Sequence, residues 1–308
     1  MGVLPKSFRE KKTDFEAVRN AVETMVWEYP FLKSFTLGKS ILGKDIPVLI
    51  LGNGRKKFLY VGAHHGMEWI TASLLLRFID EFCLLYQSNG RIGKLFVRAL
   101  WERFQIHVIP MLNPDGADYA IHGVKEDNPL RERVLKMNGR SEDFSRWQAN
   151  ARGVDLNHNY DAGFWEYKRL EAEQGIACGA PTRYSGEMPE SEPETGALCR
   201  YIRFHQPFGA ILTFHTQGEE LFWKSRGQIV PGSETAIRKL SLACGYPLNE
   251  AEGLASFGGL TDWCIASCGI PAVTLECGKG QNPLPVSDLF PIWARLRKAL
   301  FFAPTFFK

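Results

Sequence analysis

Short apolar runs alternate along this chain with segments in which apolar residues recur every three or four positions. The runs at residues 57–63 and 270–276 are nearly all apolar, which is typical of strands covered on both faces of a sheet. The segment at residues 69–86 has the spacing of an amphipathic helix. Because such strands and helices alternate, we predict an α/β fold, a three-layer α/β/α sandwich around a mixed, mainly parallel sheet.

The same patterns place the remaining elements. We expect further helices at residues 8–29, 191–205, 233–244, 261–268 and 290–302, and further strands at residues 35–38, 46–52, 105–112, 210–215 and 219–224. The segment Asn113-Pro114-Asp115-Gly116 is expected to form a turn. Residues 117–152 are polar, so we interpret them as a long insertion that shapes a site within one catalytic domain over residues 1–308.

Residues able to carry chemistry follow several of the predicted strands. His65, Asn113, His215 and Glu276 each stand at or just beyond the carboxyl end of an apolar run. Open α/β sheets build their sites at this edge, because the carboxyl ends of parallel strands meet there. We therefore expect these side chains, which lie far apart in the chain, to converge.

The segment His65-Gly66-Met67-Glu68 places an imidazole and a carboxylate three residues apart where a strand feeds a helix. Side chains at this spacing point the same way on a helical turn, and their donor atoms suit Zn²⁺. Taken alone the pair is weak, since His65 is equally typical of a core histidine. A catalytic zinc needs three protein ligands and an open position, and His215 supplies the third ligand for one Zn²⁺ ion.

Glu276 ends the apolar run 271–275, where burying a carboxylate costs several kcal/mol unless the charge is paired. A water activated on zinc beside it would give the carboxylate a role. We expect Glu276 to act as the general base that takes the proton of this water, with a pKa raised by partial desolvation.

Composition excludes some classes of function. The 308 residues include 37 basic and 34 acidic side chains, a net charge of +3 that does not favour a nucleic-acid partner. There is no apolar stretch long enough to span a membrane, and residues 1–12 lack the apolar core of a signal peptide. Seven scattered cysteines favour reduced thiols and a cytoplasmic location, while the oligomeric state stays open.

The order of these motifs resembles the zinc carboxypeptidase family, whose prototypes are the carboxypeptidase A-like enzymes. The family pattern of His-x-x-Glu, a distant His and a late Glu matches His65, Glu68, His215 and Glu276. Further segments typical of the family are present at residues 113–116, 153–157, 191–195 and 258–263. The resemblance implies a zinc metallopeptidase that hydrolyses an amide bond of a peptide substrate.

Two departures from the family pattern concern substrate binding. Exopeptidases of the family hold the substrate's terminal carboxylate with an Asn-Arg pair, and here the pair is Asn157-His158. An imidazole does not provide the bidentate clamp of a guanidinium. The arginine that polarises the scissile carbonyl falls on Gln148, with Arg146 and Arg152 as other candidates for that charge.

Together with residues 151–157 and 215–219, these departures resemble the γ-D-glutamyl-meso-diaminopimelate peptidase branch. The resemblance implies a substrate derived from muropeptides, oriented by Asn157 and His158. Arg152 or His158 would then meet a substrate carboxylate, and Glu219 or Glu220 a substrate ammonium group.

Other activities on the same fold stay open. These are an ordinary metallocarboxypeptidase, disfavoured by Asn157-His158, and an N-acyl amino-acid deacylase, disfavoured by the segment 191–195 and by the chain length. A more remote alternative is a peptide-binding module without catalysis, although the three ligands and the base are all present.

Overall fold

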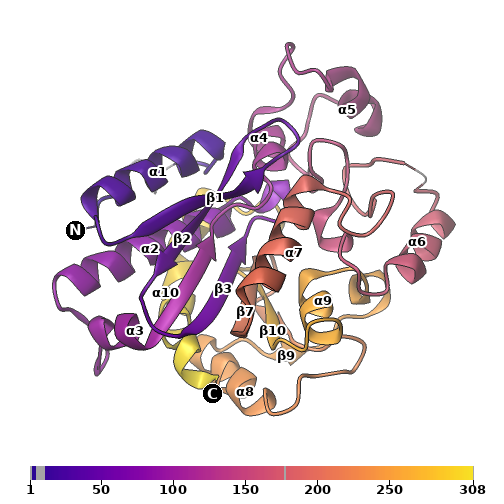
Figure 1. Ribbon diagram of the computed structural model, residues 1–308. Coiled ribbons are helices and arrows are strands. Elements are labelled where there is room, and N and C mark those ends of the chain that lie inside the picture. The colour runs from indigo at the N-terminus through magenta and orange to yellow at the C-terminus, as the bar shows by residue number, and fades with distance from the viewer. Residues whose placement is uncertain (1, 5–10, 177, 308) are drawn as a thin grey trace.

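The computed structural model describes residues 2–4, 11–176 and 178–307, and within this part an eight-stranded sheet forms the centre of the molecule (Figure 1). Its strand order is β1-β2-β6-β3-β7-β10-β8-β9. The strands are β1 (Lys33–Lys39), β2 (Asp45–Leu51), β3 (Lys56–Gly62), β6 (Phe104–Ile109), β7 (Phe208–His215), β8 (Glu220–Phe222), β9 (Leu248–Asn249) and β10 (Ala272–Glu276). The neighbours β6, β3, β7 and β10 run parallel, so their carboxyl ends meet at one edge.

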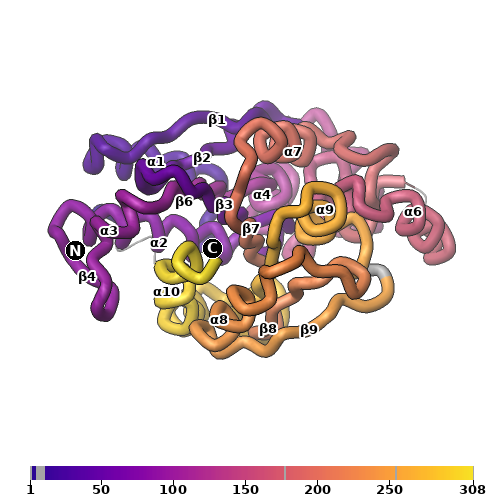
Figure 2. Tube along the Cα trace, turned by 60° about the horizontal axis from the view of Figure 1, so that its bottom comes forward, coloured from indigo at the N-terminus to yellow at the C-terminus, as the bar shows by residue number. Residues whose placement is uncertain are grey.

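Helices cover both faces of this sheet (Figure 2). Core residues on one face come from α1 (Phe15–Glu28), α2 (Ile70–Gln87), α8 (Glu234–Cys244) and α10 (Leu289–Phe306). Core residues on the other face come from α7 (Pro193–His205) and α9 (Leu260–Ala266). The remaining longer elements are α3 (Val97–Arg103), α4 (Pro114–His122), α5 (Arg131–Met137), α6 (Phe164–Glu173) and a small hairpin of β4 (Arg91–Ile92) and β5 (Leu95–Phe96). The three-layer α/β/α sandwich with a mainly parallel sheet is thus confirmed.

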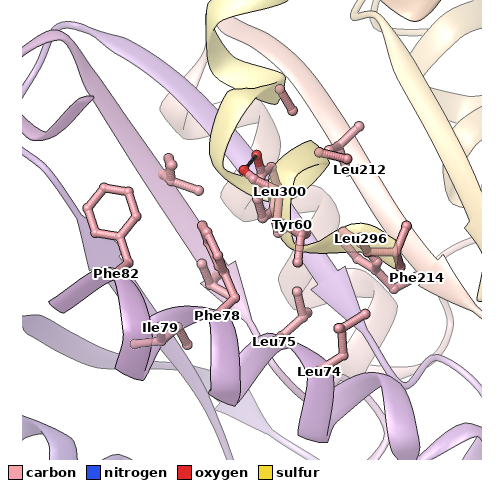
Figure 3. Packing of buried hydrophobic residues seen from close by; sticks show 14 of the residues in the cluster. Tyr60, Leu74, Leu75, Phe78, Ile79, Phe82, Leu212, Phe214, Leu296 and Leu300 are labelled. Carbon is pink, nitrogen blue, oxygen red and sulfur yellow. Dashed lines mark hydrogen bonds between the residues drawn. The ribbon is translucent and has the colours of Figure 1, made fainter. Parts of the chain in front are cut away.

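Strand β3 shows why two cores form. Its side chains alternate between the faces, so Phe58 and Tyr60 join the core under α2 and α10, whereas Leu59 and Val61 join the core under α7. Tyr60 is fully buried and donates its hydroxyl to Leu300 O of α10 at 2.9 Å (Figure 3). The hydrogen bond satisfies the one polar atom that this side chain brings into the core.

Two expectations about local structure were wrong. The segment beginning at Asn113 is no turn but the start of α4, because the Asn113 side chain accepts from Gly116 N at 2.9 Å and Pro114 occupies the first helical turn. Helix α1 begins at Phe15, capped by Asp14, rather than at residue 8; residues 8–10 of the expected helix lie outside the described residues. None of the described helices has both the length and the apolar character that a membrane crossing requires.

Candidate metal centre and active site

The topology brings the strand ends with reactive side chains to one place. Parallel pairing of β7 and β10 sets His215 directly beside Glu276, and pairing of β3 and β7 sets Gly62 beside Phe214. The chain leaves β3 through His64 and His65 and forms the short 3-10 helix η2 (Gly66–Glu68) before α2. His65 and Glu68 therefore stand next to the end of β7, as the strand-end pattern predicts.

His65, Glu68 and His215 form the group of possible metal ligands within the described residues, with one donor atom of each within 4.8 Å of the others. His65 Nδ1 and His215 Nδ1 are 3.3 Å apart, and the two Glu68 oxygens lie 2.9 and 3.1 Å from them. Two nitrogen ligands of a tetrahedral zinc are separated by about 3.3 Å, given Zn–N bonds of about 2.05 Å. The donor set and its spacing therefore fit a zinc ion.

The pKa shifts in this group also favour a bound cation. Burial would raise the pKa of Glu68, but His65 and His215 hold it at about 2. Burial would lower the pKa of His65, yet the carboxylates of Glu68 and Asp155 raise it well above its usual value. Both carboxylates are therefore stabilised by neighbouring positive charge. A divalent metal ion would supply that charge while its ligands are deprotonated.

Asp155 contacts His65 at Nε2, the ring nitrogen that does not face Glu68. Its Oδ1 lies 3.2 Å from His65 Nε2, and its Oδ2 accepts from the backbone N–H of Arg183 at 3.0 Å. Burial would raise the pKa of this carboxyl, but the nearby imidazoles of His65 and His158 lower it well below its usual range. A carboxylate in this position fixes the tautomer of the imidazole and leaves Nδ1 free to bind a metal.

His64 packs against the ligand group without joining it. Its ring stacks on that of His215 with centroids 5.2 Å apart, and its Nε2 lies 3.0 Å from the hydroxyl of Tyr160. Burial lowers the pKa of His64 well below its usual value, so the ring is neutral and fills the space behind His215.

The turn that carries the ligands is clamped from the polar insertion. Gly66 N donates to Gln148 O and Met67 N donates to Trp147 O, each at 2.9 Å. The side-chain amide of Asn113 donates to His64 O at 3.0 Å and to Ala149 O at 3.1 Å. The insertion therefore holds residues 65–68, here called the metal turn, in place. This agrees with its expected role in shaping a site.

Glu276 faces the ligand group from the neighbouring strand. Burial raises the pKa of its carboxyl well above the usual value, with a further contribution from the negative charge of Glu68. Its side chain lines a cavity of about 190 Å³, here called the Glu276 cavity, which is also lined by His65 and His215. A carboxyl group with an elevated pKa beside a metal site is suited to accept and return a proton.

The Glu276 cavity carries polar and charged groups from several elements. Asn157, His158, Lys224 and Asp262 all line it. Lys224 Nζ pairs with Glu250, and burial raises the pKa of Asp262 to about 6. The cavity therefore presents side chains of both charges.

His158 lies where the Glu276 cavity meets a second cavity, because it lines both. Its ring stacks on Tyr167 with centroids 4.1 Å apart, and its Nδ1 donates to Phe257 O at 2.9 Å. Burial lowers the pKa of His158, so the ring is neutral and Nε2 remains as a hydrogen-bond acceptor. In this state Nε2 is suited to accept an N–H group and not to bind a carboxylate.

The second cavity, here called the Arg183 cavity, has a volume of about 450 Å³ and is more open. Its wall includes Arg146, Gln148 and Arg183, with Met67 and Asp155. Gln148 is held by Thr182, whose hydroxyl donates to its side-chain oxygen. Since His65 lines both cavities, the ligand group lies between them.

The structure places three candidate residues elsewhere. Arg152 pairs with Glu192 at 3.3 Å, Glu219 pairs with Lys279 at 3.2 Å, and Glu220 accepts from Asn249. None of these three described side chains lines the Glu276 cavity or the Arg183 cavity. Asn157, His158, Arg146 and Gln148, in contrast, all reach one cavity or the other.

Sequence reasoning did not assign roles to Asp155, Lys224, Asp262 or Arg183. Asp155 had a signal, because an acidic residue between apolar Val154 and Leu156 is expected to need a buried partner. Arg183 had none, because its position depends on contacts with residues far away in the chain.

Comparisons with known proteins agree with this geometry. The profile of a family described as zinc carboxypeptidase matches residues 18–299. The chain is 33% identical over 285 residues to gamma-D-glutamyl-L-diamino acid endopeptidase 1 of Lysinibacillus sphaericus. That match covers 92% of this chain and 70% of the relative. It is 30% identical over 300 residues to the uncharacterized protein YqgT of Bacillus subtilis. That match covers 96% of this chain and 78% of YqgT. The crystal structure of thrombin activatable fibrinolysis inhibitor superimposes with a TM-score of 0.75 at 21% identity, covering 100% of this chain and 77% of that chain.

Proposed function

The chain belongs to the zinc carboxypeptidase family, and from this premise we propose that it hydrolyses γ-D-glutamyl–diamino acid bonds in peptides derived from the bacterial cell wall. The observation that carries the proposal is the convergence of His65, Glu68 and His215 with Glu276 at one cavity. The similarity to the Lysinibacillus endopeptidase supports the choice of bond.

The proposed mechanism assigns each of these side chains a role. His65 and His215 through Nδ1, and Glu68 through its carboxylate, would hold the metal, while Asp155 orients His65. When bound, a zinc ion would lower the pKa of a water towards about 7 and polarise the scissile carbonyl. Glu276 takes the proton of the attacking water and returns it to the nitrogen of the departing amine.

The two cavities suggest how the substrate lies. The diamino acid occupies the Glu276 cavity, where Lys224 and Asp262 meet its charged groups and Glu276 reaches the leaving nitrogen. Asn157 and His158 orient the substrate there, His158 by accepting an N–H group. The γ-D-glutamyl residue occupies the Arg183 cavity, where Gln148 donates to the developing oxyanion.

Two broader expectations belong to the same proposal. The 308 residues form one catalytic domain, since the family profile extends over most of them. The enzyme acts in the cytoplasm, a location that the seven unpaired cysteines favour.

A substrate panel tests the proposal. The purified protein, loaded with zinc, is assayed with γ-D-glutamyl-diaminopimelate peptides, a hippuryl amino acid and an N-acyl amino acid. We expect hydrolysis of the γ-D-glutamyl bond, its loss with a chelator and its return with zinc. Preferential cleavage of the hippuryl or acyl substrate would identify a carboxypeptidase or a deacylase instead, and binding without any turnover would identify a binding module.

Glu276→Gln tests the mechanism. The variant keeps the shape of the side chain but has no basic carboxylate, so we expect a loss of kcat of about 10²- to 10⁴-fold. Zinc content, measured by elemental analysis, should equal that of the wild type. Turnover at the wild-type rate would exclude the role given to Glu276.

A further inference from the structure

Two arginine side chains without a carboxylate partner line the Arg183 cavity. Arg146 and Arg183 are both exposed, and in the described part of the chain neither forms a salt bridge, whereas Arg152 pairs with Glu192. Arg183 Nη1 donates only to the neutral side chain of Gln174, at 3.3 Å. Arg146 is near enough to Asp143 for their charges to interact, but no carboxylate holds either guanidinium group at salt-bridge distance, so both can bind an anion.

The wall of this cavity contains little negative charge to offset them. Among its described lining residues Asp155 is the one acidic side chain. Both of its oxygens are already in use, one toward His65 Nε2 at 3.2 Å and one toward Arg183 N at 3.0 Å. The cavity thus has an excess of positive charge on one side of the ligand group.

A γ-linked glutamyl residue brings a negative charge to this place. Its side-chain carboxyl forms the scissile amide, so its α-carboxylate stays free, at most about 5 Å from the scissile carbonyl carbon along the extended carbon chain. An α-linked peptide with a neutral residue on this side of the bond has no carboxylate there. A cation in the cavity therefore distinguishes a γ-linked glutamyl residue from neutral α-linked residues.

The backbone of Arg183 is fixed relative to the ligand group. Asp155 joins Arg183 N to His65, and the hydroxyl of Tyr167 donates to Arg183 O at 2.9 Å. Arg183 has a φ of 68°, in the left-handed region that non-glycine residues rarely adopt. Such a conformation persists only where neighbouring contacts hold it, and here those contacts set the starting point of the side chain.

We propose that Arg183, assisted by Arg146, binds the free α-carboxylate of the γ-D-glutamyl residue and thereby favours substrates that carry this carboxylate. The proposal rests on the proposed function, because it takes the γ-D-glutamyl bond as the bond that is cut. A guanidinium pairs with a carboxylate through two parallel N–H groups, which is a geometry that an isosteric carboxamide does not match.

Two substrates that differ in one group test this proposal. The first is a γ-D-glutamyl-diaminopimelate peptide with a free α-carboxylate, and the second has an α-carboxamide in its place. We expect the zinc-loaded wild type to favour the carboxylate in kcat/KM by about 10- to 100-fold, the range for a charge-assisted contact. Arg183→Gln should reduce this preference at least about tenfold by slowing the carboxylate substrate only.

Matched variants separate carboxylate binding from other roles. Arg183→Lys keeps the charge without the paired N–H groups and should give an intermediate preference. Arg146→Gln should weaken the preference less than Arg183→Gln, and the double variant should abolish it. Lys224→Met, at a cation of the Glu276 cavity, should keep the wild-type preference whatever its overall rate.

The outcomes distinguish this proposal from the proposed function. If the wild type cleaves neither γ-D-glutamyl peptide, the proposed function fails. If it cleaves both with equal kcat/KM, the function stands and the carboxylate contact is wrong. If Arg183→Gln slows both substrates by the same factor, Arg183 stabilises the oxyanion or the fold instead, and the proposal is overturned. This conclusion holds even if the variant folds poorly, because the wild-type ratio is measured independently.

Discussion

Asp155 acts on the metal centre without belonging to the ligand group. It holds His65 Nε2 at 3.2 Å and also accepts from Asn157 N at 3.2 Å, so one carboxylate orients a ligand and the segment that faces the substrate. The sequence places Asp155 only two residues before Asn157, which is why a single short turn serves both purposes. Contacts of this kind set the affinity of a metal site as well as its geometry.

Asp155→Asn should therefore weaken zinc binding by about 10- to 100-fold. The amide keeps the hydrogen-bond acceptor but loses the negative charge that holds the imidazole in the metal-binding tautomer. Competition with a zinc-binding dye measures the affinity, and Asp143→Asn, at an exposed carboxyl, is the control. Equal affinities for Asp155→Asn and the wild type would show that the charge on this side of His65 does not matter.

His215→Ala removes one of the three proposed ligands and should leave the protein with little zinc after dialysis. His215 is buried beside His64, so the deletion also creates a cavity and is expected to lower stability by a few kcal/mol. Elemental analysis measures the zinc, and circular dichroism shows whether the variant is folded. Stoichiometric zinc in folded His215→Ala would mean that this histidine is not a ligand.

At the scale of elements, the metal turn depends on a close contact between η2 and α4. A Cβ added at Gly66 would stand 2.2 Å from Gly116 O and 2.3 Å from Gly116 C, which are backbone atoms that cannot rotate away. The contact lets Gly66 N reach Gln148 O at 2.9 Å. A glycine is therefore required here for close packing.

Gly66→Ala should push η2 away from α4 and displace His65 and Glu68, which flank the substituted position. We expect a loss of stability of about 1–3 kcal/mol from overpacking, together with a weaker zinc site. Denaturant unfolding and zinc titration measure the two effects. Gly139→Ala, at a glycine with open space around it, controls for the change of residue type, although its positive φ of 62° adds some strain of its own. Wild-type zinc affinity in Gly66→Ala would show that the turn adapts.

The elements differ in how far the sequence predicts them. Strands β3, β7 and β10, with the candidate ligands and Glu276 at their ends, follow from local patterns, because apolar runs and strand ends are features of neighbouring residues. The start of α4 was missed because Asn113-Pro114 is compatible with either a turn or a helix cap. Arg183 was missed because the hydrogen bond that positions it joins it to Asp155, 28 residues earlier in the chain.

At the scale of the whole molecule, a buried carboxyl group couples stability to pH. Glu194 on α7 is fully buried; its oxygens accept from Ile41 N and from the side chain of Asn150, each at 3.3 Å. Burial, together with the negative charges of Asp115 on α4 and Glu192 just before α7, raises its pKa from 4.5 to about 8. At neutral pH the folded protein therefore keeps this group protonated while the unfolded chain releases the proton.

Because the folded-state pKa of Glu194 is the higher one, its contribution to stability is complete below about pH 4.5 and is lost as the pH rises toward about 8. Glu194→Gln cannot ionise, so its free energy of unfolding should exceed that of the wild type by a few kcal/mol at pH 9, while at pH 5 the two should be close. Urea unfolding at pH 5, 7 and 9 with the same metal loading measures the difference. Glu173→Gln, at an exposed carboxyl on α6, should show no such trend. A constant gap between Glu194→Gln and the wild type over this pH range would mean that Glu194 is already ionised in the folded protein, with the amide of Asn150 sufficient to carry its charge.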